Sequence, residues 1–569
     1  MTQPMTQPMT QTMSRPRHRR LRSVAGVAAL AALPLLVLGA FFVLPVAGMV
    51  GRGFFVSGSF DAMGVLEILG RGRVHRVLWF TVWSAGAATA VTVALGLPVT
   101  FVLHRLRFPG RRLLRAFVLM PFVLPTVVVG VAFRTLLTSS GPLGWLHLDG
   151  TPVAIVAAMV FFNLAVVVRT VGALWEGVDR RREEAASALG ASPIQVLRTV
   201  TLPALMPGVI SAASVVFLFC ATSFGVVLTL GGLRYATVET EIYLLTTQFL
   251  DLRAAAALSV LQLAVVSVLL YVAQRTGPAR GQVLDRAAHR ETTRRPRRGD
   301  AAVLALTALV IAALAAPLVT LVVRSLRADG GWTLRSYRNL ATRGEGGDGG
   351  ALLVPVTEAL ANSWRVAVDA TLLAMLLGVL VSVVVSRRPR ARLERRGLAV
   401  LDALFMLPLG VSAVTLGFGF LVTLDQPPLD LRGSPWLVPI AQALVALPLV
   451  VRTLAPLLRS IDPRQRQAAA SLGASPLRVL TAVDLPALWR PLLAATGFAF
   501  AVSLGEFGAT SFLARPDRPT LPVVIYQLVS RPGEQNFGMA LAASVVLALV
   551  TVAAMALVER LRIGSVGAF

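Results

Sequence analysis

A few polar side chains stand inside long apolar stretches of this sequence, where they could bind a solute. Glu506 lies in Ser-Leu-Gly-Glu-Phe-Gly-Ala-Thr-Ser-Phe, and its counterpart in an internal repeat is Ser223. Ionisable residues in such stretches are costly and often functional. A lone carboxylate facing a pore would favour a cationic solute; alternatively, Glu506 caps a helix or pairs with an arginine at a helix end. Asn163 is a weaker candidate, more typical of an interhelical hydrogen bond.

Other kinds of chemistry find little support in the sequence. Cys220 is the single cysteine, so the chain cannot form an internal disulfide framework or a cysteine-based metal site. The five histidines are scattered, and no lysine is present. A Walker A loop needs a lysine to hold nucleotide phosphates, so this chain cannot be its own P-loop ATPase. We expect no catalytic residue, no metal site and no bound cofactor.

The most informative feature is a polar segment that occurs twice. Residues 184–205 return as residues 467–488, at an offset of 283 positions. In each copy a serine-proline pair predicts a helix start, with serine as the N-cap and proline at the first helical position. A short helix precedes it, a glycine forms the turn between the two, and a later proline (Pro203, Pro486) is expected to end the element. Each copy therefore predicts a helical hairpin, whose paired alanines allow another protein to approach closely.

The pattern Glu-Ala-Ala, three residues, Gly and then Leu-Pro resembles the cytoplasmic coupling loop of ABC-importer permeases. In that family the loop docks into a groove of the ATPase subunit and transmits nucleotide-driven motion to the membrane helices. Gln467 replaces the acid in the second copy, so the two docking contacts are expected to differ in strength. A hairpin merely duplicated with the gene is the alternative. The resemblance assigns ATPase coupling to Glu184, Ala185, Ala186, Gly190, Pro193, Leu197, Pro203, Gln467, Ala468, Ala469, Gly473, Pro476, Leu480 and Pro486.

Composition indicates a polytopic membrane protein. Of 569 residues, 56% are hydrophobic and 14% charged, and the mean hydropathy is +0.73. The formal charge of +26 could suggest nucleic acid. However, the arginines cluster in short loops between apolar runs, as the positive-inside rule predicts for a membrane protein, and we expect no nucleic-acid partner.

Apolar runs of spanning length predict about 12 transmembrane helices in two six-helix halves. The runs lie near 24–50, 78–103, 114–137, 152–173, 206–231 and 255–273, and near 301–323, 366–386, 398–424, 435–457, 491–513 and 538–558. Arginine clusters place both termini and both duplicated segments in the cytoplasm. Arg71, Arg73 and Arg76 are an exception, since they fall in a loop on the other side. An even number of spans per half makes the repeats parallel.

The predicted organisation follows from these runs. We expect a disordered N-terminus over 1–23, a first permease half over 24–274, a basic cytoplasmic linker over 275–300, a second half over 301–560 and a tail over 561–569. The fold class is an all-α polytopic membrane protein in two homologous halves.

A finer resemblance concerns the solute. Thr201-Leu-Pro-Ala-Leu, the run from Ser223 to Gly232 and the run from Thr237 to Tyr243 resemble the fused two-half permeases of thiamine and ferric-iron importers. The motif from Gly505 to Thr510 also resembles permeases for sulfate, molybdate and related oxyanions. In such importers an external binding protein makes most of the selection.

We therefore expect a transport subunit of the cell membrane, surrounded by lipid, that works with two copies of a cytoplasmic ABC ATPase and an extracytoplasmic substrate-binding protein. Its solute would be ferric iron or thiamine, with oxyanions and polyamines as alternatives. An ion-coupled secondary transporter is the rival from another class. It would require several carboxylates within the membrane, whereas Glu506 is nearly alone, and it leaves the paired hairpins unexplained. A non-transporting scaffold would not need two matched hairpins.

Overall fold

The protein is almost entirely helical in the part of the chain that its structure describes. The computed structural model describes residues 29–56, 58–276, 293–328, 330–346, 350–386, 392–406, 411–424, 430–431 and 433–563. The predicted N-terminal tail, most of the basic linker and most of the C-terminal tail therefore lie outside the described residues. Within them the strands form two short antiparallel hairpins, with Phe55 opposite Phe60 and Arg327 opposite Trp332. The predicted all-α class is confirmed.

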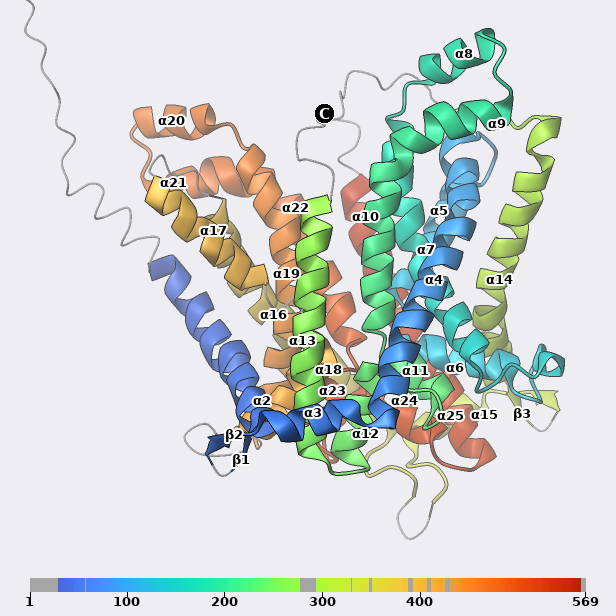
Figure 1. Cartoon of the computed structure of the whole chain (residues 1–569), viewed down its shortest axis with the longest axis vertical. Helices are drawn as coiled ribbons and strands as arrows, with labels where there is room; N and C mark the ends of the chain where they lie inside the picture. Colours follow the sequence, from blue (N-terminus) through green and yellow to red (C-terminus); the bar gives the residue numbers. More distant parts are fainter. Residues whose placement is uncertain are drawn as a thin grey trace, which may run out of the picture.

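The two halves repeat one order of long helices (Figure 1). The first contains η1 Gly39–Val43, α2 Leu44–Phe54, β1 Phe55–Val56, β2 Ser59–Phe60, α3 Ala62–Gly70, α4 Gly72–Arg105, α5 Arg111–Leu119, η2 Met120–Val123, α6 Thr126–Leu137, η3 Gly144–Leu146, α7 Pro152–Glu176, α8 Arg180–Ala188, α9 Pro193–Val196, η4 Leu197–Thr201, α10 Leu202–Ala221, α11 Gly225–Gly231, α12 Val238–Thr247 and α13 Leu252–Thr276. The second contains η6 Arg298–Asp300, α14 Ala301–Ser325, β3 Arg327–Ala328, β4 Gly331–Trp332, α15 Arg335–Arg338, η7 Asn339–Ala341, α16 Val356–Val385, α17 Arg392–Met406, α18 Ala413–Thr423, α19 Leu437–Ser460, α20 Pro463–Ser471, α21 Pro476–Val479, η9 Leu480–Asp484, α22 Leu485–Leu504, α23 Thr510–Leu513, α24 Leu521–Val529 and α25 Glu534–Ile563.

The count of straight spans is lower than the predicted twelve. Among the described residues nine helices are long and apolar enough to cross a membrane, and one bent pair would make a tenth span. That pair, Arg111–Val123 and Thr126–Leu137, bends by 105°. Leu124, at the break, is extended (ψ 140°) because it precedes Pro125, and a proline disfavours the helical conformation of the residue before it. The run at 114–137 is therefore wrong as a single helix.

Three other predicted runs are also divided. The run at 206–231 is split between α10 and α11, the run at 398–424 between α17 and α18, and the run at 491–513 between α22 and α23. The breaks leave short helices, α11 with α12 and α23 with α24, in the part of the molecule away from α8 and α20 (Figure 1). Hydropathy does not detect these breaks because the residues around them stay largely apolar.

The first long helix of each half packs against the opposite half. The span Ala29–Phe54 contacts α18 through its α2 segment, and Phe41 lies 6.0 Å from Phe420 between ring centroids. In the equivalent way α14 contacts α6, and its Val310 and Leu314 join a buried core that belongs mainly to the first half. This exchange of equivalent helices binds the halves together.

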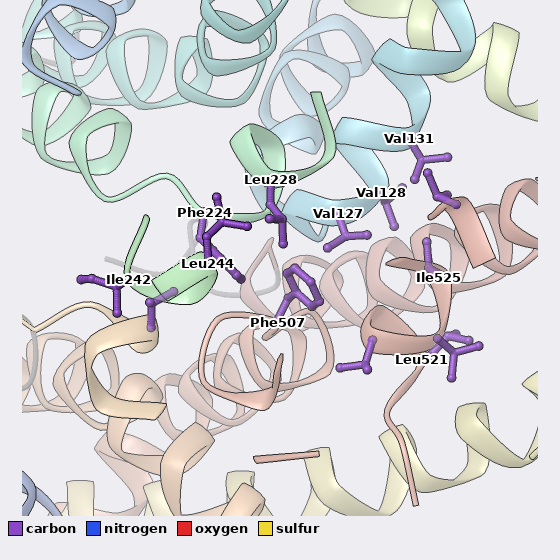
Figure 2. Close-up of a cluster of buried hydrophobic side chains, with 14 of the residues drawn as sticks. Val127, Val128, Val131, Phe224, Leu228, Ile242, Leu244, Phe507, Leu521 and Ile525 are labelled. Atoms are coloured by element: carbon purple, nitrogen blue, oxygen red, sulfur yellow. The ribbon is translucent and has the colours of Figure 1, made fainter. Parts of the chain in front are cut away.

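We call the remaining contact surface between the halves the seam. It consists of α12 against α18 and of α24 and α25 against α6. Figure 2 shows its buried side chains, with Val128 of α6 near Ile525 of α24 and with Phe224 near Phe507. Apart from α25, the seam is built from the shorter helices around the breaks.

Candidate functional site

Each duplicated segment forms a helical hairpin, and the two hairpins lie at the same end of the molecule on opposite sides (Figure 1). The first consists of α8 and α9, and the second of α20 and α21. Asp179 caps α8 by accepting the Arg181 N–H at 3.0 Å, and Asp462 caps α20 by accepting the Arg464 N–H at 2.9 Å. Equivalent residues therefore start both hairpins in the same way.

A glycine makes the turn in both hairpins. Gly190 has φ +88° and Gly473 has φ +80°, in the left-handed region that other residues adopt only at a cost. Neither glycine has an atom within 4 Å of the position of an added Cβ. Backbone conformation, and not lack of space, is what requires glycine here.

The serine-proline helix start is present as well, but the later proline does not end the element. Ser192 forms a capping box with Gln195. Beyond α9 the chain passes through the π-helical turn η4 into α10, with Pro203 in the first turn of α10. Pro486 has the equivalent place in α22. The prediction that these prolines terminate the helix is wrong, because a wide turn just before each one accommodates a residue without an N–H.

The tip of each hairpin exposes one leucine almost completely. Leu189 is 88% exposed and Leu472 is 89% exposed. Small side chains stand beside both leucines. The positions assigned to coupling are exposed at Glu184, Ala185, Gly190, Pro193, Leu197, Pro203, Gln467, Ala468, Gly473 and Pro486, and half-buried at Ala186 and Ala469. The side chains of Pro476 and Leu480 lie outside the described residues. Two matched, exposed tips suit docking of the same kind of partner at both.

Each hairpin is tied to the residue just before the long helix that follows it. In the first half, Glu183 on α8 accepts a hydrogen bond from Thr201 at 2.9 Å and also pairs with Arg105 at the end of α4. In the second half, Arg466 on α20 pairs with Asp484 at 2.8 Å. The tied positions are equivalent, but the hairpin contributes an acid in the first half and a base in the second.

A second tie shows the same exchange of charge. Glu176 at the end of α7 pairs with Arg115 of α5 at 2.7 Å, and Arg459 of α19 lies 3.6 Å from Asp402 of α17. The arginine of each pair also donates to a backbone carbonyl at the end of α4 or α16. The first tie joins each hairpin to a long helix of its own half, and the second joins α5 or α17 to the long helices beside it.

The three solute-path candidates do not converge on one point. Glu506 is 7% exposed, and its carboxylate accepts the Ala509 N–H at 2.8 Å, the Thr510 N–H at 3.1 Å and the Thr510 hydroxyl at 2.5 Å. It thus caps α23, in agreement with the interpretation of Glu506 as a helix cap. Asn163 donates to Cys220 of α10 at 3.3 Å and so links two helices. The Ser223 carbonyl accepts the Thr237 hydroxyl at 3.2 Å.

This duplicated architecture matches one known family in both halves. The family model described as "Binding-protein-dependent transport system inner membrane component" matches residues 93–277 and 374–562. The chain belongs to this family. It is the permease of a binding-protein-dependent ABC importer and a multi-pass protein of the cell membrane, and it works with a substrate-binding protein.

Relatives of the permease match it over both halves. It is 27% identical over 552 residues, 95% of each chain, to "Thiamine transport system permease protein ThiP" of Brucella abortus strain 2308. The protein of the same name from Escherichia coli K12 is 29% identical over 476 residues, 81% of this chain and 84% of that one. A solved structure of a bacterial ABC transporter that imports alginate matches 45% of this chain and 97% of that one, with 17% identity and a TM-score of 0.38.

Sequence reasoning missed two buried carboxylates in the permease. Glu239 has no exposed surface, and Glu241 is 1% exposed. Glu239 accepts a hydrogen bond from Gln262 and another, at 2.5 Å, from Ser412 of the second half. Glu506 is therefore not nearly alone, and the family match, rather than a count of carboxylates, decides against the secondary transporter. A signal was available, because both acids lie in the short segment between the apolar runs at 206–231 and 255–273.

Two of the three arginines that broke the positive-inside pattern are paired with acids in the permease. Arg73 binds Glu241 at 2.5 Å, and Arg71 binds Asp251 at 2.9 Å. Partial burial by itself would raise the pKa of Asp251, but the Ala254 N–H and the Arg71 guanidinium outweigh it and lower that pKa. The acid stays charged near neutral pH, so these arginines act as ion-pair partners and carry little net charge with them.

Proposed function

We propose that this permease imports thiamine. The main support is the full-length likeness to the ThiP proteins, 27% identity over 95% of both chains, which covers both halves and the connection between them. The ferric-iron alternative rests only on motifs that such permeases share. The oxyanion alternative also has a relative, a sulfate transport permease that is 34% identical, but that match covers only 34% of this chain. The polyamine alternative has no motif of its own. Thiamine is therefore the first solute to test.

We propose further that two copies of an ABC ATPase dock on the hairpins. The end of the molecule that carries α8 and α20 would then face the cytoplasm, with both termini on the same side. The support is the pair of matched tips, where Leu189 and Leu472 stand almost fully exposed at equivalent positions. ATP would be hydrolysed by those subunits, and this chain would hold no cofactor of its own.

Uptake in whole cells tests the solute. Cells with and without this gene are compared for uptake of labelled thiamine, labelled ferric iron and labelled sulfate, each with and without ATP depletion. We expect thiamine uptake alone to require the gene and to stop on ATP depletion. Loss of iron or sulfate uptake in its place would overturn the thiamine proposal, and gene-dependent uptake that survives ATP depletion would overturn the ATPase coupling.

Co-purification tests the docking sites. We expect Leu189→Asp and Leu472→Asp each to weaken binding of the ATPase and the double variant to abolish it, because a buried charge in the groove is unfavourable. Leu334→Asp is a matched control, since Leu334 is 55% exposed and lies beyond β4, away from the hairpins. Equal recovery of the ATPase with all variants would place the docking surface elsewhere.

A further inference from the structure

Four of the aromatic rings that meet at the seam form a pattern that repeats between the halves, and a fifth ring, Phe512, also contacts Tyr243. Phe224 precedes α11 and Phe507 precedes α23, and they occupy the same position of the repeat. Their rings stack with centroids 5.2 Å apart and planes 24° apart (Figure 2). Tyr243 stands edge-on to Phe224 at 5.4 Å, and Tyr526 lies 5.6 Å from Phe507. The two tyrosines are also equivalent. We call these residues the ring quartet.

A contact between equivalent residues fixes where the quartet lies. In a two-fold arrangement, a position touches its own counterpart only on or close to the symmetry axis. For parallel repeats of a transporter that axis runs along the membrane normal, and the solute site lies at the interface of the repeats. The Phe224–Phe507 stack therefore stands on the route between the halves, and both rings are buried, 5% and 2% exposed.

Two buried acidic residues accompany the rings, although their placement is not symmetric. Glu239 lies one helical turn before Tyr243 on α12, and Glu506 directly precedes Phe507. Their counterparts are Ser223 for Glu506 and Pro522 for Glu239. In the described part of the chain, neither acid has an arginine or histidine within ion-pair distance. Both instead accept hydrogen bonds from neutral groups.

The chemistry of these groups favours one class of solute. Aromatic faces attract flat rings and cations, and buried carboxylates without a basic partner favour positive charge. We propose that the ring quartet is a selective constriction, which parts at the Phe224–Phe507 stack to hold a flat aromatic cation between the rings as it crosses the seam. Thiamine, with its pyrimidine and its cationic thiazolium ring, is such a solute, so the inference rests on the proposed function.

The test replaces the rings and keeps their apolar character. Labelled thiamine uptake is measured in proteoliposomes that contain the complete importer, with Phe224→Leu, Phe507→Leu and the double variant. Loss of the π faces should lower the uptake rate at subsaturating thiamine about tenfold in the double variant, which corresponds to a typical cation–π energy. Phe224→Tyr with Phe507→Tyr keeps both rings and should retain most of the uptake.

Controls separate this inference from folding and from the proposed function. Phe161→Leu removes a ring of a buried aromatic pair inside the first half, 5.4 Å from Phe133, and should leave thiamine uptake within about twofold of the parent. The wild-type importer and the Phe→Leu double variant could take up thiamine at the same rate. That result would overturn the constriction and leave thiamine import standing. Equal losses in the Phe→Tyr and Phe→Leu variants would overturn it as well, since packing alone would explain them. Absence of thiamine uptake by the wild-type importer would overturn both proposals.

Discussion

Arg466 and Asp484 form an ion pair, with 2.8 Å between Nε and Oδ1, at the two positions that Glu183 and Thr201 occupy in the first half. The same two points of the fold are therefore joined in both halves, but by different chemistry. This joint connects each hairpin to the start of α10 or α22. We therefore expect the connection between the hairpin and the long helix to matter for transport in both halves.

Breaking this tie should uncouple the second hairpin without unfolding the permease. Asp484→Ala removes the acid, and we expect lower thiamine uptake with a loss of stability of about 1 kcal/mol, because Arg466 is partly solvated. The measurements are uptake in proteoliposomes and a thermal melt in detergent. The exchanged variant Arg466→Asp with Asp484→Arg restores the pair and should recover uptake. A failure of recovery, with the protein folded, would show that the pair has no positioning role.

Breaking the equivalent tie of the first half should cost more stability. Glu183→Ala leaves Arg105 without its carboxylate, and the Arg105 side chain is only 6% exposed. An uncompensated buried charge of this kind costs about 3 kcal/mol. The expected result is a clearly lower melting temperature than for Asp484→Ala. Asp517→Ala is the matched control, because its pair with Arg515 is 55% and 46% exposed and should contribute almost nothing.

Thiamine uptake should depend on the backbone conformation at the two hairpin turns. Gly190→Val forces a β-branched residue into a left-handed conformation at a cost of about 1–2 kcal/mol, and we expect it to abolish uptake while the protein remains in the membrane. Gly190→Asn should retain partial uptake, since asparagine tolerates that region. Gly473→Val should do comparable harm if both hairpins couple. Normal uptake by both valine variants would contradict a coupling role for the hairpins.

Two substitutions of Glu506 should separate its role as a helix cap from the effect of its charge on the solute. Glu506→Ala removes the cap of α23 and should lower stability by about 1 kcal/mol or more. Glu506→Gln keeps an acceptor oxygen but loses the charge, so we expect a near-normal melting temperature with slower thiamine uptake. Thermal melts and uptake of the two variants decide the matter. If Glu506→Gln imports thiamine at the parental rate, the residue is a cap and its charge does not act on the solute.

Much of the hairpin architecture could be predicted because its signals are local. Ser192, Pro193 and Gly190 act on the residues beside them, so capping and turn chemistry predict the two short helices and the bend between them. Because the segment repeats at an offset of 283 positions, Ser475, Pro476 and Gly473 predict a second hairpin of the same kind. The role of these residues in binding an ATPase stays a prediction.

The sequence by itself determined the membrane class, the two-fold repeat and the paired hairpins, because hydropathy, charge clusters and short motifs depend on neighbours in the chain. Pro125 is a local signal for the 105° bend in the run at 114–137, although hydropathy does not detect it. Only the tertiary structure decided that Pro203 continues a helix and that Phe224 meets Phe507. It also decided that Glu239 bonds to Ser412, 173 positions away. Such contacts arise from how two halves pack about an axis, and no local pattern of residues specifies that packing.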